Sequence, residues 1–79
     1  MREILIKNGY EDVSSGYFYE KVINNANINI YKFADSEKFR FDLYMDTGSE
    51  SVHYIKDFSS EEELLSAENF AKMVLENMK

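Results

Sequence analysis

Residues 38–57 of this chain read KFRFDLYMDTGSESVHYIKD, and their pattern decides the fold. Apolar and polar side chains alternate along the first part, where the apolar set is Phe39, Phe41, Leu43 and Met45. Because successive side chains of a strand point to opposite faces, the alternation predicts a strand over 38–45 with one buried face. The next four residues, 46–49, are Asp-Thr-Gly-Ser, which suits a hairpin turn and leads into a second predicted strand over 51–57.

The chain before this hairpin contains further segments of strand length. Clusters of Asn, Asp, Ser and Gly separate runs rich in Ile, Val, Tyr and Phe, which predicts strands near 3–7, 17–23 and 28–34. Residues 10–24 also fit a short helix as an alternative. The side chains that recur there at helical spacing are Tyr10, Val13, Tyr17 and Lys21.

The C-terminal segment has the pattern of an amphipathic helix. Ser59 and Ser60 are favoured N-cap residues, and Ser60 with Glu63 fits a capping box. Steps of three and four then define one apolar stripe, made of Leu64, Ala67, Ala71, Val74 and Met78, with Phe70 and Leu75 beside it. Leu65 and Met73 lie off this stripe, which suits either packing at its edge or contact with a partner.

These elements predict a single α+β domain over residues 1–79. It is an antiparallel meander of four or five strands, with one C-terminal amphipathic helix packed on one face. Turns at 46–49 and 35–36 give a register in which apolar residues share the inner, helix-covered face. The predicted partners are Met45–Glu50, Leu43–Val52, Phe41–Tyr54 and Asp42–His53 across the first turn, and Phe41–Ile30 and Leu43–Ile28 across the second.

The opposite, outer face of the sheet is rich in aromatic residues. The same alternation gives it Tyr31, Phe33, Arg40, Asp42, Tyr44, His53 and Ile55. One interpretation is a second packing layer, formed by the N-terminal strand and residues 17–19. The other is an open face, whose aromatic rings around Arg40 have the composition of a hot spot for protein binding or homodimerisation. Stacking of RNA bases would need similar rings, but the acidic net charge argues against it.

The composition narrows the classes of function. The chain has no Cys, which excludes disulfides, thiolate nucleophiles and Cys-based zinc sites. The N-terminal apolar run, residues 4–6, is too short for a signal peptide, and no later run reaches membrane-spanning length. We therefore expect a protein without membrane contact in the cytoplasm of a bacterial or phage-infected cell. Without a Gly-rich phosphate loop or a nucleophile–base pair, we expect neither an enzyme nor a cofactor.

His53 is the single histidine. A metal site would need several carboxylate or imidazole partners, and Asp42 is the one neighbour predicted across the strands. We therefore expect no metal site and interpret the two residues as an exposed cross-strand pair.

Asp46-Thr47-Gly48-Ser49 resembles the active-site signature of aspartic proteases, in which two carboxylates share a proton. The resemblance implies an aspartyl hydrolase that uses Asp46. The family's loop is braced by a glycine further along the chain, and neither of the other two glycines, Gly9 and Gly16, lies downstream. The same four residues suit a hairpin turn, which is the interpretation we favour.

The net charge of −6 is unevenly placed. Residues 1–41 hold six acids and six bases, whereas residues 42–79 hold nine acids and three bases. Acids in the first turn of a helix are stabilised by the helix dipole, which accounts for part of this excess. The functional interpretation is one acidic surface that docks on a basic partner, made of Asp46, Glu50, Asp57, Glu61, Glu62, Glu63, Glu68 and Glu76.

A small, acidic, Cys-free chain of strands followed by an acidic helix resembles the phage inhibitors called anti-CRISPR proteins. The matching features are the 46–50 hairpin and the acidic positions of the C-terminal helix. The resemblance implies a non-enzymatic inhibitor or adaptor whose carboxylates occupy the nucleic-acid groove of a basic, nucleic-acid-handling protein. The start of the helix after a meander also resembles antitoxin domains, which implies a homodimeric structural or regulatory module that uses the aromatic outer face.

Overall fold

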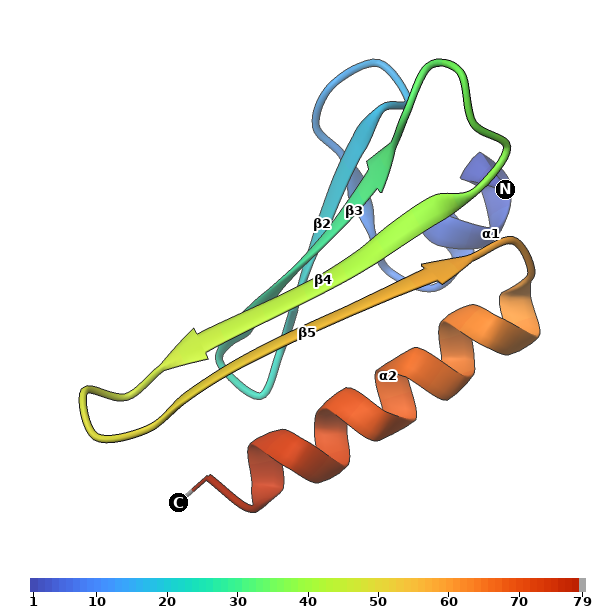
Figure 1. The fold of residues 1–79 in the computed structure, drawn as a ribbon. Helices are drawn as coiled ribbons and strands as arrows, with labels where there is room; N and C mark the ends of the chain where they lie inside the picture. The colour runs from blue at the N-terminus through green and yellow to red at the C-terminus, as the bar shows by residue number, and fades with distance from the viewer. Residues whose placement is uncertain (79) are drawn as a thin grey trace.

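The computed structural model describes residues 1–78, shown as a ribbon in Figure 1. Its elements in chain order are α1 (Arg2–Lys7), β1 (Glu11–Asp12), β2 (Phe18–Ile23), β3 (Ala26–Lys32), β4 (Phe39–Asp46), β5 (Ser51–Phe58) and α2 (Glu61–Glu76). The five strands lie in the order β1-β2-β3-β4-β5, each antiparallel to its neighbours, and α2 packs against β4 and β5. The predicted α+β meander with a C-terminal helix is therefore confirmed.

The N-terminus is a helix, so the strand predicted near 3–7 is wrong. The backbone N–H of Leu5 donates to the carbonyl of Met1, and Asn8 ends the helix by donating its side-chain amide to the carbonyl of Ile4. Met1, Ile4 and Leu5 all meet the core, which is the spacing of one helical face. Three apolar residues, 4–6, are too few to distinguish the two-residue period of a strand from the 3.6-residue period of a helix.

The alternative helix over residues 10–24 is also wrong, because two strands occupy this segment. The turn between β2 and β3 consists of Asn24 and Asn25, whose positive φ angles of 49° and 69° suit a two-residue hairpin. This turn pairs Ile23 with Ala26 and fixes the register of β2.

Both helices lie on the same, inner face of the sheet. Lys7 at the end of α1 forms an ion pair with Glu61 at the start of α2, and Leu5 shares one core with Leu64. The centre of this core consists of strand residues with no exposed surface, namely Ile28, Ile30, Phe41 and Leu43. The predicted apolar face of β4 is therefore the one that the helices cover.

The register between β3 and β4 is as predicted, with Ile28 opposite Leu43 and Ile30 opposite Phe41. The register between β4 and β5 differs from the prediction by two residues. The structure pairs Met45 with Val52, Leu43 with Tyr54, Phe41 with Lys56 and Asp42 with Ile55. Thr47 donates its backbone N–H to the carbonyl of Glu50, so the four-residue loop covers 47–50 instead of 46–49 and Asp46 lies opposite Ser51. Because the shift is even, every side chain keeps its predicted face.

Candidate functional site

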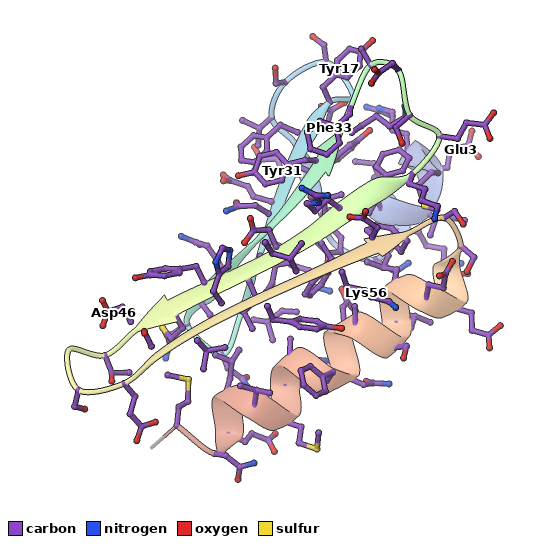
Figure 2. The ribbon with its side chains drawn as sticks, in the orientation of Figure 1. Glu3, Tyr17, Tyr31, Phe33, Asp46 and Lys56 are labelled. Carbon is purple, nitrogen blue, oxygen red and sulfur yellow. The ribbon has the colours of Figure 1, made fainter. Side chains whose placement is uncertain are left out.

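The outer face of the sheet carries no helix and no second layer among the described residues. Figure 2 shows Tyr31 and Phe33 together near the end of β3, and Phe33 is 46% exposed. The predicted covering layer is wrong because the N-terminal segment packs on the inner face and Tyr19 points into the core. The residues of this outer face are Glu11, Phe18, Glu20, Val22, Asn27, Asn29, Tyr31, Phe33, Arg40, Asp42, Tyr44, Asp46, His53, Ile55 and Asp57.

An arginine surrounded by aromatic rings occupies one end of the outer face. Phe18 and Tyr31 are cross-strand neighbours whose rings stack with centroids 5.1 Å apart. The guanidinium of Arg40 lies 5.2 Å from the centroid of the Phe33 ring, within reach of a cation–π interaction. Arg40 also donates from Nε to Oδ1 of Asp57 at 2.8 Å. This pair raises the pKa of Arg40 and lowers the pKa of Asp57, so both groups are charged at neutral pH.

A second aromatic group lies toward the hairpin. The Tyr44 and His53 rings meet edge to face with centroids 5.7 Å apart. Nε2 of His53 lies 3.0 Å from Oδ1 of Asp42, which confirms the predicted contact, although the two residues are diagonal instead of directly opposite. Tyr44 is 54% exposed and donates its hydroxyl to Asp46. The outer face therefore presents rings whose positions are set by their neighbours.

The outer face is acidic as well as aromatic. Its carboxylates are Glu11, Glu20, Asp42, Asp46 and Asp57, and the one cation among its strand residues is Arg40. Five carboxylates against one guanidinium leave a formal charge of −4 when His53 is neutral. Charge of one sign on an exposed face steers a partner of the opposite sign and repels one of the same sign.

Sequence reasoning missed the contribution of β2 to this face, namely Phe18, Glu20 and Val22. Lys21 interrupts the apolar alternation of this strand, because its side chain points to the inner face. The available signal was the pair Asn24 and Asn25, since a two-residue turn there places Phe18 opposite Tyr31.

Glu68 is buried, so its predicted place on an exposed acidic surface is wrong. Oε2 of Glu68 accepts a hydrogen bond from the Tyr10 hydroxyl at 2.6 Å and one from Nζ of Lys21 at 3.0 Å. Burial, together with the hydrogen bond to Glu68, raises the pKa of Tyr10 far above its ordinary value. Lys21 also donates to the carbonyl of Asn8, so this cluster ties the N-terminal segment, β2 and α2 together.

Three more of the predicted acidic residues have partners within the chain. Asp57 pairs with Arg40, and Glu61 pairs with Lys7 at 2.9 Å while accepting from Asn8. Glu63 donates its N–H to the Ser60 hydroxyl, which is one half of the predicted capping box, while its carboxylate accepts from the backbone and side chain of Ser59 instead of the N–H of Ser60.

The remaining acidic residues are far apart in the fold. Asp46 and Glu50 flank the β4–β5 hairpin, whereas Glu62 lies at the start of α2, beyond the other end of β5 (Figure 1). Glu76 is the last residue of α2. The eight predicted carboxylates thus do not gather on one surface, and two of them, Asp46 and Asp57, belong to the outer face.

The Asp-Thr-Gly-Ser segment forms the turn of the hairpin. Oδ1 of Asp46 accepts from the N–H of Gly48 at 2.8 Å, and Gly48 has a φ of +90°, which few other residues adopt. Thr47 accepts from the N–H of Glu50 through its hydroxyl. The side chain of Asp46 is therefore engaged in the turn that we favoured from the sequence.

Within residues 1–78 no group of His, Asp or Glu side chains is arranged to hold a metal ion. No helix in this part of the chain has the length and apolar content needed to cross a bilayer. Comparison with models of protein families, with curated proteins and with solved structures finds no match for this chain.

Proposed function

We propose that this chain is a non-enzymatic binding protein, an inhibitor or adaptor, which docks the outer face of its sheet on a protein with a basic surface. The observation that carries this proposal is the exposed aromatic and acidic composition of one whole side of the sheet. Monomeric proteins seldom leave large apolar side chains clustered in this way unless the cluster is a contact surface.

The aromatic rings supply the affinity in this proposal. Tyr, Phe and Arg are overrepresented among residues that dominate binding energy, and here they lie next to one another on adjacent strands. Arg40 is already oriented by Asp57 and Phe33, so little side-chain freedom is lost when a partner docks.

The carboxylates determine the class of partner. A face with five acids and one base repels phosphate backbones and also repels a second identical face. Both direct nucleic-acid binding and face-to-face homodimerisation are therefore disfavoured. A basic protein is favoured as the partner, and such basic surfaces are typical of proteins that bind nucleic acids. The outer face would then cover the surface of the partner that otherwise binds phosphates.

Affinity capture from the producing cells, followed by reconstitution with the purified partner, tests the proposal. The binding variant is Phe33→Ser with Tyr44→Ser, whose side chains are 46% and 54% exposed. The matched control is Leu65→Ser with Met73→Ser on α2, at 40% and 54% exposure. We expect the first variant to weaken binding by about tenfold or more and the control to bind normally.

Salt provides the second readout of the same experiment. Affinity of the purified pair should fall as ionic strength rises, because the carboxylates meet a basic surface. Equal loss in both variants, or an affinity indifferent to salt, would contradict the proposed docking face. A partner captured equally well by the Phe33→Ser and Tyr44→Ser double variant would also contradict it.

A further inference from the structure

The strand β5 is a long free edge of the sheet. It is eight residues long and pairs along its whole length with β4 only. Among residues 1–78, no backbone or side-chain group bonds the side of β5 that faces away from β4. The other edge, β1, has only two residues, and Asp12 there is held by Arg2 and by the N–H of Gly16. An unpaired edge of this length is a template for another strand.

A groove continues this edge on the inner face. Its volume is about 400 Å³, and it lies between β5 and the flank of α2. Tyr54 and Lys56 line it from the strand, while Glu62, Glu63 and Ser66 line it from the helix. Beside it the Phe70 ring lies 4.7 Å from the Tyr54 ring, yet Phe70 remains 43% exposed. A strand added to β5 would place its inner-face side chains in this groove.

The sequence of β5 is complementary to itself in one register. A two-fold axis perpendicular to a sheet pairs antiparallel copies so that one residue faces its own copy. With Ile55 at the axis, His53 faces Asp57, Val52 faces Phe58, and Tyr54 faces Lys56 of the second copy. Phe58 is already buried in its own core, so the pairs that gain contact are an imidazole with a carboxylate and a ring with an ammonium group, both favourable cross-strand neighbours.

The neighbouring registers are worse. An axis at Lys56 sets two ammonium groups against each other and places Ile55 opposite Asp57. An axis at Tyr54 places Val52 opposite Lys56 and leaves Asp57 opposite Ser51. Like charges or mismatched polarity directly across a strand pair are destabilising.

We propose that two copies of this chain pair β5 to β5 about an axis through Ile55, which joins the five strands of each copy into one ten-stranded sheet. The axis is perpendicular to the sheet, so the helices of both copies lie on the same side. The two outer faces then form one continuous surface without contacting each other. This inference does not depend on the proposed function, because it uses the edge of the sheet instead of its face.

Analytical ultracentrifugation of the full chain tests the inference with substitutions at the axis. Ile55 is 47% exposed, so Ile55→Lys is tolerated by the fold but sets two ammonium groups against each other in the pair. We expect the dissociation constant of the dimer to rise by about tenfold or more. Val22→Lys is the matched control, because Val22 is an exposed β-branched residue on the same face but on β2, away from the edge. This control should dimerise as the natural chain does.

Mixing two variants gives the sharpest outcome. Because residue 55 faces its own copy, Ile55→Lys and Ile55→Glu should each dimerise more weakly than the natural chain when alone and should form a heterodimer when mixed. A natural chain that stays monomeric at the highest soluble concentration overturns the inference and leaves β5 free for an extended segment of another protein. A dimer that survives Ile55→Lys, or one lost in Val22→Lys, overturns it as well and points to a different contact surface.

Discussion

The two faces of this sheet come from the same strands but differ in their exposure to solvent. Along β4, Phe41 and Leu43 have no exposed surface, whereas Tyr44 between Leu43 and Met45 is 54% exposed. The inner face is closed by two helices, and the outer face is open. Alternation thus separates residues that hold the fold from residues that are free to bind, and each can be changed without the other.

The largest effect is expected at the centre of the inner face. Phe41→Ala removes a fully buried ring that contacts Tyr54, and we expect the free energy of unfolding to fall by about 4 kcal/mol. Chemical denaturation measures this change. A loss of less than about 1 kcal/mol would mean that the core can collapse around the cavity and that the inner face is not close-packed.

A slightly smaller loss is expected from the buried polar cluster. Glu68→Ala removes the acceptor of the buried Tyr10 hydroxyl and the carboxylate that balances the charge of Lys21, which keeps only the Asn8 carbonyl, so we expect a loss of about 3 kcal/mol. Glu62→Ala on the exposed side of α2 is the control and should change stability by less than about 0.5 kcal/mol. Equal effects of the two substitutions would contradict the structural role of Glu68.

Capping of α2 contributes less. Ser60 accepts from the N–H of Glu63, and Ser60→Ala should cost about 1 kcal/mol in the same denaturation experiment. Ser66→Ala, in the exposed middle of the same helix, should cost nothing because Ala is the better helix former. A Ser60→Ala variant as stable as the natural chain would place the start of the helix elsewhere.

Acid should weaken the fold through carboxylates that have hydrogen-bond or ion-pair partners in the folded chain. Hydrogen bonds or ion pairs lower the pKa of Asp12, Asp57, Glu61 and Glu63. Each group then binds a proton more weakly in the folded state, so its stabilisation is present above the ordinary carboxyl pKa of about 4 and is lost as the pH falls below it. Urea midpoints measured against pH should show this decline. Asp57→Asn should make it shallower, and an unchanged slope would contradict the role of the Arg40 pair.

The smallest effect on stability is expected on the outer face. Phe33→Ser with Tyr44→Ser changes two half-exposed rings and should lower the free energy of unfolding by about 1 kcal/mol or less. A loss as large as that of Phe41→Ala would mean that the outer face is a second core, and the contrast between the faces would fail.

The strands with clear alternation were predictable from the sequence, whereas the N-terminus was not. Alternation in β4 and the turn residues around it predicted the meander, and the faces that it assigned to residues of β3, β4 and β5 agree with the structure. The strand predicted near 3–7 was wrong because Ile4, Leu5 and Ile6 fit a strand and a helix equally well. The contact that holds the end of this helix, between Asn8 and Glu61, joins residues far apart in the sequence.

The acidic surface shows a different limit of sequence reasoning. The sequence does not indicate whether a given carboxylate is solvated, paired or buried in the fold. Lys21 and Glu68 are separated by 47 positions, and only the packing of α2 on the inner face of the sheet brings them together. The open state of the outer face likewise followed from the helical N-terminus, which no local pattern revealed.

Hydroxyl-radical footprinting of the protein with its captured partner tests the central claim most directly, because oxidation reports the exposure of individual side chains. The account predicts that Tyr31, Phe33 and Tyr44 lose reactivity in the complex, while Leu65 and Met73 on α2 react as in the free protein. Protection of α2 with unchanged reactivity on the outer face would contradict it.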